Sequence, residues 1–259
     1  MPEADDLALL TDAARAAGRI ALRYWRNDPK SWDKGGDHGP VSEADLAVNQ
    51  DLAARLRAAR PDYGWLSEET PDDARRLGAE TLIILDPIDG TRAFLAGEEA
   101  FSIALAVVRD GQPVAGVVYL PAKDRLYAAT ASGPATRDGQ PIRCSDRADL
   151  AGADVLTTRA AMAPEHWPAG VPDLKRSFRA SLAWRLCLAA EGAHDAMLTL
   201  RPAWDWDIAA GALIARRAGC LVSNRHGAPL RFNAADPRAD GVVVANPALH
   251  RAMLAALGA

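Results

Sequence analysis

Acidic side chains gather in three short segments, each next to an apolar stretch of the chain. In chain order they are Glu68, Glu69, Asp86, Asp89 and Asp207. Carboxylate oxygens are ligands that Mg²⁺ prefers, and such an ion keeps bound water that can act as a nucleophile. If the three segments meet in the fold, the pattern predicts hydrolytic chemistry at a divalent-metal centre.

The segment Asp86–Thr91 carries the strongest signal. Its two aspartates stand three residues apart, with a proline and a glycine that shape the backbone. Both carboxylates and the Ile88 carbonyl can then face one point, whereas a simple turn would need neither both aspartates nor Thr91. We expect Thr91–Ala96 to form the first turns of a helix, whose free amide groups attract an anion such as phosphate. The segment therefore predicts cations beside a phosphate cradle.

The other acidic residues have plainer interpretations that the sequence leaves open. Glu68 and Glu69 could form a solvated turn. Asp207 could be the N-cap of a helix, and Asp45 could close a capping box that begins at Ser42. The histidines show no ligand spacing, which disfavours zinc; they are His38, His166, His194, His226 and His250.

Helices followed by a mostly antiparallel sheet are expected to position the first two segments. Apolar spacing predicts an amphipathic helix from Leu7 to Tyr24, and a second helix from Ser42 to about Ala59. Between them, Lys30–Gly39 is a polar, glycine-bearing loop that could be a mobile flap. The Asp110-Gly111 pair is a hairpin signal. Apolar runs predict strands at Tyr63–Leu66, Thr81–Leu85, Phe101–Val108, Pro113–Leu120 and Arg125–Thr130.

The remainder of the chain alternates between strand and helix patterns, which is typical of a layered α/β unit. Strands are expected at Asp154–Thr158, Ala193–Leu200, Cys220–Val222 and Gly241–Ala245. Helices are expected at Ser181–Glu191, Ile208–Ala218 and Pro247–Leu257. We therefore expect an α/β protein with an α+β part at residues 1–145, which carries most metal ligands. An α/β part at residues 146–259 would carry Asp207 and the side that selects the substrate.

Composition excludes several classes of protein. The 259 residues are 49% hydrophobic and 25% charged, as in ordinary globular chains. A net charge of −4 argues against a nucleic-acid polymer as partner. Three scattered cysteines without a CxxC pair argue against a disulfide framework. The acidic N-terminus and the lack of a long apolar run indicate neither a secretory signal nor a membrane span, so we expect a cytoplasmic protein.

Three motifs together resemble the inositol monophosphatase family of lithium-sensitive, magnesium-dependent phosphatases. They are the Glu68-Glu69 pair, DPIDGT at Asp86–Thr91 and WDIAAG at Trp206–Gly211. The resemblance covers almost the whole chain, including VSEAD at Val41–Asp45. It implies an αβαβα layered sandwich and a small phosphorylated metabolite as substrate.

The resemblance also implies a role for each acidic residue at a centre of two or three Mg²⁺ ions. Glu68, Asp86 and the Ile88 carbonyl would hold one ion. Asp86, Asp89 and Asp207 would hold a second ion on the substrate side. Since each ion would share Asp86, the motifs would have to converge on a single pocket.

The remaining roles concern water and phosphate. Asp45 with Glu68 would help to hold a third, weaker ion. Thr91 would orient the attacking water with Asp45 as its partner. The Gly90 and Thr91 amides would receive the phosphate.

The sequence gives fewer signs of the substrate. Inositol-specific members carry an acidic residue seven positions before Asp207, where this chain has Leu200. Arg185 lies near a position where a bacterial branch acting on adenosine 3′,5′-bisphosphate often has lysine. It could bind a second phosphate, or be a solvated arginine on its helix. Trp204 and Trp206 could stack on a base, or pack beside the metal site.

We therefore favour a 3′(2′),5′-bisphosphate nucleotidase, which could form a homodimer. An inositol-1-monophosphatase or a histidinol-phosphate phosphatase is the alternative. A protein of a different class would be a regulator that binds metal and phosphate without turnover. The sequence counts against it, because every expected metal ligand and Thr91 are present. Only a measurement of phosphate release separates it from an enzyme.

Overall fold

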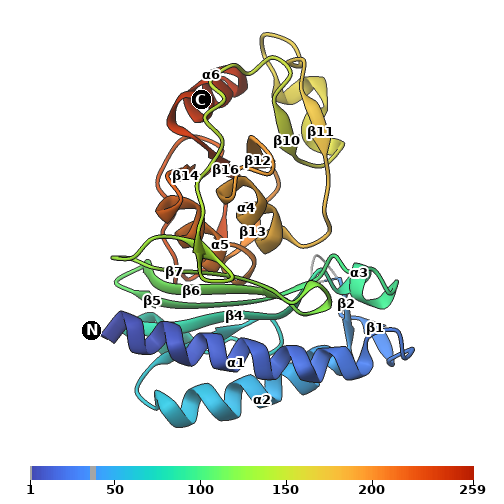
Figure 1. The fold of residues 1–259 in the computed structure, drawn as a ribbon, viewed down its shortest axis with the longest axis vertical. Coiled ribbons are helices and arrows are strands. Elements are labelled where there is room, and N and C mark those ends of the chain that lie inside the picture. The colour runs from blue at the N-terminus through green and yellow to red at the C-terminus, as the bar shows by residue number, and fades with distance from the viewer. Residues whose placement is uncertain (1, 36–38) are drawn as a thin grey trace.

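The computed structural model describes residues 2–35 and 39–259 and shows five layers of helices and sheets (Figure 1). The outer layer holds α1 (Pro2–Tyr24) and α2 (Glu43–Ala59). Helix α1 begins ahead of the expected Leu7, with acidic residues in its first turn, where they favour a helix. The N-cap Ser42 and Asp45 form the expected capping box of α2.

The second layer is a seven-stranded sheet in the order β3-β4-β5-β6-β7-β8-β9. Strands β3 and β4 pair in parallel, and all the other neighbours pair antiparallel. This confirms the mostly antiparallel sheet expected from the sequence. The strands are β3 (Gly64–Ser67), β4 (Thr81–Asp89), β5 (Ser102–Arg109), β6 (Gln112–Leu120), β7 (Arg125–Thr130), β8 (Thr136–Arg137) and β9 (Gln140–Pro141).

Two helices form the middle layer, α4 (Leu182–Ala190) and α5 (Asp205–Arg217). Gly211 lets them approach closely, because a Cβ at this position would lie only 2.7 Å from Leu186 Cβ. A five-stranded sheet in the order β11-β10-β12-β16-β14 covers them, and α6 (Pro247–Leu257) covers that sheet. Its strands are β10 (Asp154–Leu156), β11 (Lys175–Ser177), β12 (Ala196–Thr199), β14 (Leu221–Ser223) and β16 (Val242–Ala245).

Apolar runs that are buried on both faces explain the layers. On β4, Ile83 and Leu85 belong to the core beneath α1 and α2, whereas Leu82 and Ile84 belong to the core beneath α5. Successive side chains of a strand point to opposite faces, so one continuous apolar run serves two cores. Strand β16 does the same between the middle layer and α6. The αβαβα sandwich is confirmed.

Short elements connect the layers. They are the pair β1 (Ser31–Asp33) and β2 (Pro40–Ser42), the helix α3 (Thr91–Leu95), the pair β13 (Ala203–Trp204) and β15 (Arg238–Ala239), and the 3₁₀ helices η1 (Ala74–Gly78), η2 (Pro121–Lys123), η3 (Ala160–Met162) and η4 (Pro164–His166). Part of the expected Lys30–Gly39 flap is therefore paired backbone. His38, within that segment, lies outside the described residues.

Among the expected boundaries that were wrong, two concern acidic residues. Strand β4 does not end at Leu85 but continues to Asp89. Helix α5 does not begin at Ile208 but at Asp205, so Asp207 lies in its first turn rather than before it. The division of the chain into two parts at residue 145 stays a proposal. One hydrophobic core contains residues from both parts. None of the described helices is both long and apolar enough to cross a membrane.

Candidate metal and phosphate site

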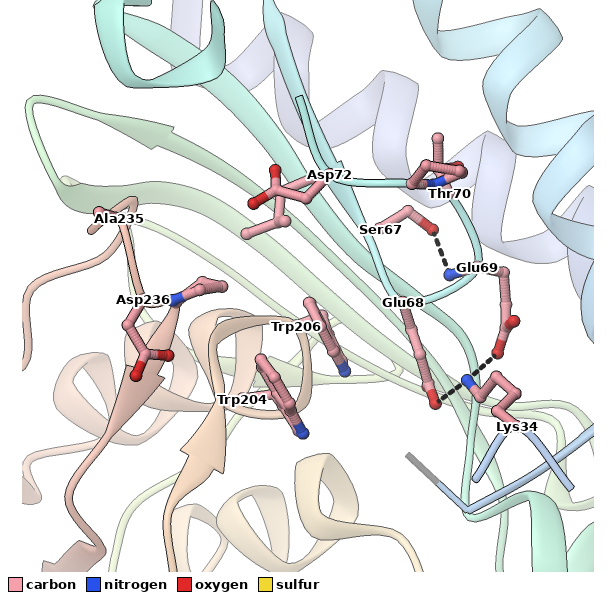
Figure 2. Close-up of a pocket in the computed structure, with 13 residues that line it drawn as sticks. Lys34, Ser67, Glu68, Glu69, Thr70, Asp72, Trp204, Trp206, Ala235 and Asp236 are labelled. Atoms are coloured by element: carbon pink, nitrogen blue, oxygen red, sulfur yellow. Dashed lines mark hydrogen bonds and ion pairs between the residues drawn. The ribbon is translucent and has the colours of Figure 1, made fainter. Parts of the chain in front are cut away.

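Glu68 and Glu69 follow β3, and a lysine from the segment after β1 bridges them. Lys34 Nζ lies 2.7 Å from Glu68 Oε1 and 2.8 Å from Glu69 Oε1 (Figure 2). The two carboxylate side chains are only 14% and 5% exposed, so a solvated turn is ruled out. Burial alone would lower the pKa of Lys34. The attraction of the two carboxylates is stronger than this effect, so the pKa of Lys34 is raised. The sequence gave no sign of this role for Lys34 beyond a lysine in a chain whose basic residues are mostly arginine.

The end of β4 carries Asp86 and Asp89, separated by a β-bulge. Asp86 pairs with Ala104 of β5 and Asp89 pairs with Ser102, so β4 has one extra residue between the two pairs. In a regular strand, residues three apart point to opposite faces. A bulge re-aims side chains. This irregularity lets both aspartates serve one site.

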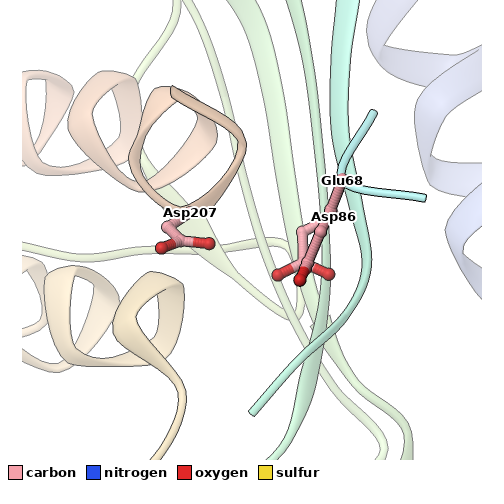
Figure 3. Close-up of side chains that lie close together, drawn as sticks. All are labelled: Glu68, Asp86 and Asp207. Carbon is pink, nitrogen blue, oxygen red and sulfur yellow. The ribbon is translucent and has the colours of Figure 1, made fainter. Parts of the chain in front are cut away.

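A carboxylate cluster forms where β3, β4 and α5 meet. Glu68, Asp86 and Asp207 each offer an oxygen, and these oxygens lie within 4.8 Å of one another (Figure 3). Three carboxylates at this spacing are a suitable donor set for a hard divalent cation such as Mg²⁺. The expected convergence of three distant motifs is therefore present in the fold.

Burial and mutual repulsion disfavour the ionised forms of the clustered carboxylates. Burial raises the pKa of Asp86 well above its usual range, and the neighbouring carboxylates raise it further. Asp207 shows the same effect, first from burial and then from Asp89 and Glu68. Burial also raises the pKa of Glu68 to about 7, although Lys34 opposes the shift. Bound divalent ions would remove this repulsion, so the chemistry of the donor set fits a metal centre.

Asp45 and Thr91 form a hydrogen-bonded pair beside the cluster. Thr91 Oγ1 lies 3.3 Å from Asp45 Oδ1 and 3.1 Å from the Ile88 carbonyl. Asp45 also accepts bonds from the Ser42 amide and hydroxyl, so its capping role and its contact with Thr91 coexist. Burial raises the pKa of Asp45 to about 6, against the effect of these bonds.

Asp89 lies outside the group of three and makes its own contacts. Its Oδ2 accepts hydrogen bonds from Ser181 Oγ at 2.6 Å and from the Ala183 amide at 2.7 Å. Burial raises the pKa of Asp89, although Ser181 and two backbone amides oppose the shift. The sequence gave no sign that an aspartate of β4 would bond the first turn of α4. Asp89 adds to the repulsion on Asp86 and Asp207, so it remains a close neighbour of the cluster.

Gly90 makes the turn from β4 into α3. Its φ of 98° lies in the left-handed region, and a Cβ would come within 2.9 Å of the Ala100 carbonyl oxygen. Only glycine fits both conditions without strain. The helix that follows, Thr91–Leu95, is short and begins at the expected residue, Thr91. Gly90 and Thr91 line the same cavity as the carboxylates.

A cavity of about 730 Å³ joins these groups. Its lining includes the carboxylates Glu68, Asp86, Asp89 and Asp207, and also Ile88, Gly90 and Thr91. Four arginines line the same cavity, namely Arg92, Arg185, Arg201 and Arg238. Acidic residues that attract cations thus share one space with basic residues that attract anions.

Arg185 is the least exposed of these arginines. It is 3% exposed, which rules out the solvated alternative, and burial lowers its pKa to about 10. One Nη donates to the Ala180 carbonyl, and the guanidinium lies 4.9 Å from the Phe178 ring centre. Within the part of the chain that the structure describes, its buried Nε has no hydrogen-bond partner. A buried, incompletely bonded guanidinium in a cavity is suited to bind an anion.

The two tryptophans of the third motif stack on each other. The ring centres of Trp204 and Trp206 lie 4.6 Å apart, and the planes differ by 9°. Trp206 is buried, and Trp204 packs against the largest core. Both tryptophans also line the cavity that holds the carboxylates, so packing and stacking on a base both stay predictions. Leu200 is buried in the core beneath α6, whereas the next residue, Arg201, lines the cavity.

The sequence model of the Inositol monophosphatase family matches residues 4–258. This chain belongs to the inositol monophosphatase family. It is 32% identical to an inositol-1-monophosphatase of Mesorhizobium japonicum, over 97% of this chain and 95% of that protein. It is 30% identical to the 3′(2′),5′-bisphosphate nucleotidase CysQ of Escherichia coli K12, over 85% and 90% of the two chains.

A solved family structure shows the same fold. The Thermotoga maritima inositol monophosphatase superposes with a TM-score of 0.85 at 26% identity, over 98% of this chain and 97% of that one. Members of the inositol monophosphatase family are metal-dependent phosphatases, so the chain is a phosphoric monoester hydrolase that acts on small phosphorylated substrates. The two relatives act on different substrates but are similarly identical to this chain. Sequence identity therefore does not select the substrate, and the residues of the cavity have to be considered instead.

Proposed function

We propose that this chain is a Mg²⁺-dependent 3′(2′),5′-bisphosphate nucleotidase that converts adenosine 3′,5′-bisphosphate to AMP and phosphate. The observation that carries the proposal is Arg185, a buried guanidinium with a free Nε in the same cavity as the carboxylate cluster. A substrate with two phosphates needs a second anion site apart from the metal centre. Arg185 and the cavity arginine Arg201 provide its chemistry.

Two or three Mg²⁺ ions would be held by Glu68, Asp86, Asp89, Asp207 and the Ile88 carbonyl, with Asp45 and Glu68 sharing the weakest one. Bound Mg²⁺ neutralises phosphoryl charge and lowers the pKa of a coordinated water. Thr91 Oγ1, already within hydrogen-bond distance of Asp45, orients the attacking water. Asp45 holds Thr91 in place. The Gly90 and Thr91 amides bind the phosphoryl oxygens.

Leu200 supports the same choice against inositol phosphates. Its side chain is buried in the core and cannot accept a hydrogen bond from a ring hydroxyl. The first test compares kcat/KM for adenosine 3′,5′-bisphosphate, inositol 1-phosphate and histidinol phosphate at saturating Mg²⁺. We expect the bisphosphate to be preferred. Preference for either alternative substrate would replace the proposed one while keeping the phosphatase.

Arg185→Met tests the second-phosphate site directly. We expect kcat/KM for adenosine 3′,5′-bisphosphate to fall about 10- to 100-fold, because a charge-assisted hydrogen bond contributes about 1.5–3 kcal/mol. Adenosine 3′-monophosphate lacks the second phosphate and should lose much less. Arg55→Met, on the exposed face of α2, is the control and should change neither value. Equal losses on both nucleotides would contradict the assigned role.

Membership of a phosphatase family favours turnover over a regulator that only binds metal and phosphate. A phosphate-release assay with Mg²⁺ and a panel of monoesters measures that turnover. Millimolar lithium should inhibit the enzyme if the weakest ion site is present. The homodimer and the cytoplasmic location stay predictions, which gel filtration and cell fractionation would test.

A further inference from the structure

Two ligands of the carboxylate cluster stand on segments that are far apart in the sequence. Glu68 follows β3, and Asp207 lies in the first turn of α5. A second cavity, of about 620 Å³, separates these segments, with Glu68 and Asp72 on one side and Trp206 and Asp236 on the other (Figure 2). The packing of α5 on β3 and β4 within one core fixes part of the distance between the two ligands. Polar contacts beside this cavity add to it.

On the α5 side, Asp205 anchors the start of the helix. Its amide donates to the Pro237 carbonyl at 2.8 Å, and its Oδ2 accepts from the Asn233 amide at 2.9 Å. The Asp205 side chain is buried. Residues 233–237 therefore hold the first turn of α5, two residues before Asp207.

On the β3 side, Arg76 reaches from η1 to the same segment. Its Nη1 donates to Asn233 Oδ1 at 2.8 Å and to the Ala234 carbonyl at 2.9 Å. Its Nε and Nη2 donate to the two oxygens of Asp72, at 2.6 and 2.8 Å. Arg76 is 3% exposed. This buried guanidinium joins the segment after Glu68 to the segment that holds Asp205.

Asn233 is bonded from both directions. Its Nδ2 donates to the Arg76 carbonyl at 3.0 Å, while its Oδ1 accepts from the Arg76 guanidinium. Its backbone amide bonds Asp205. The residue has a φ of 67°, in the left-handed region that asparagine tolerates better than most residues. Asparagine therefore meets both the backbone and the side-chain requirement of this position.

We propose that Arg76, Asn233 and Asp205 are positioning residues that set the distance between Glu68 and Asp207. We call these three residues the clamp. The inference rests on the proposed metal site, because the clamp acts on ligands of that site and touches neither metal nor substrate. Mutation of residues that orient metal ligands without binding the metal typically lowers metal affinity or activity 10- to 100-fold. The clamp would act less directly, through the two backbone segments that carry Glu68 and Asp207.

Asn233→Gly is the sharpest test variant. Glycine accepts a φ of 67° and keeps the amide that bonds Asp205, so the variant removes only the side-chain bonds to Arg76. Asp72→Asn is a second variant, which weakens the hold on Arg76 from its other side. Arg75→Ala is the matched control, since Arg75 lies in the same 3₁₀ helix with a side chain that is 90% exposed.

Calorimetric titration of metal-free protein with Mg²⁺ is the main readout. We expect Asn233→Gly and Asp72→Asn to bind Mg²⁺ at least about tenfold more weakly than the unmodified protein. Arg75→Ala should bind it normally. The gain in melting temperature on adding Mg²⁺ should shrink in the same two variants.

Two results would overturn the inference in different ways. If Asn233→Gly only lowers the melting temperature, equally with and without Mg²⁺ and at unchanged Mg²⁺ affinity, the clamp is structural and the metal site stands. If the unmodified protein binds no Mg²⁺ at millimolar concentration, the proposed metal site fails, and the clamp fails with it.

Discussion

Asp89 on β4 and Ser181 at the start of α4 are joined by a hydrogen bond of 2.6 Å. Ser181 is the N-cap of α4, and Asp89 also accepts the amide of Ala183 in the first turn. A carboxylate near a helix N-terminus is stabilised by the free amide groups there. The seven-stranded sheet and the middle helices are thus connected at the edge of the candidate site.

Asp89→Asn should abolish most turnover and leave the fold intact. The amide oxygen of asparagine can still accept a bond from α4, but the charge that would bind a cation is lost. Loss of several kcal/mol of transition-state stabilisation corresponds to a decrease in kcat of about a hundredfold or more. Phosphate release and circular dichroism measure the two effects. Near-normal activity would remove Asp89 from the site.

Ser181→Ala separates the capping contact from the charge. Loss of an N-cap side chain typically costs about 0.5–2 kcal/mol of stability. We therefore expect a lower urea midpoint, with a much smaller loss of turnover than in Asp89→Asn. If Ser181→Ala abolished turnover as fully, orientation of Asp89 rather than its charge would be the limiting factor.

The stability of the metal-free protein should decrease as pH rises. Folding raises the pKa of Asp45 from 3.8 to about 6 and that of Glu68 from 4.5 to about 7. The folded state therefore binds more protons than the unfolded chain in this range. The stability contributed by these groups is fully present below the unfolded pKa values and is lost as pH rises to about 7.

Urea unfolding of metal-free protein at pH 5.5 and pH 8 measures this effect. Mg²⁺ should reverse the trend, because a cation binds ionised carboxylates and its affinity rises with pH. Glu68→Gln should flatten the pH dependence of the metal-free protein. The same slope with and without Mg²⁺ would show that these carboxylates do not bind the ion.

The sequence was informative wherever a local pattern carries the chemistry. The apolar run at Thr81–Leu85 predicted a strand, and the DPIDGT motif predicted a metal and phosphate site directly after it. The bulge was not predictable, because its register depends on pairing with β5. The contacts of Lys34, and of Arg76 with Asn233, were equally hidden, since they join residues that only the folded chain brings together. Motifs identified the candidate ligands, and tertiary contacts decide how these side chains are held.

Lys34→Met should destabilise the metal-free protein more than the Mg²⁺-bound protein. The ammonium group neutralises Glu68 and Glu69 at 2.7 and 2.8 Å, and this matters most when no cation shares the charge. Differential scanning calorimetry with and without Mg²⁺ measures the difference. Lys30→Met, in the same segment, is the control and should have little effect. Equal destabilisation in both conditions would mean that Lys34 does not substitute for a cation.

Gly90→Ala should lower the stability of the protein more than Gly139→Ala, although both glycines have a positive φ. At Gly90 the φ is 98°, and a Cβ would lie 2.9 Å from the Ala100 carbonyl oxygen and 3.3 Å from the Ser181 amide nitrogen. Gly139 has a φ of 78° with no atom within 4 Å of its Cβ position, so Gly139→Ala isolates the conformational strain. That strain is worth about 1–3 kcal/mol.

The clash at Gly90 adds to this strain and is made with backbone atoms, of Ala100 before β5 and of Ser181 at the start of α4, so relieving it means moving backbone. Urea unfolding at saturating Mg²⁺ compares the two variants. Gly90→Ala should also lose phosphatase activity, since the turn sets the Gly90 and Thr91 amides, whereas Gly139→Ala should remain fully active. Equal stability losses in the two variants would show that the turn can relax around a methyl group, and the close approach to Ala100 would then have no role in forming the site.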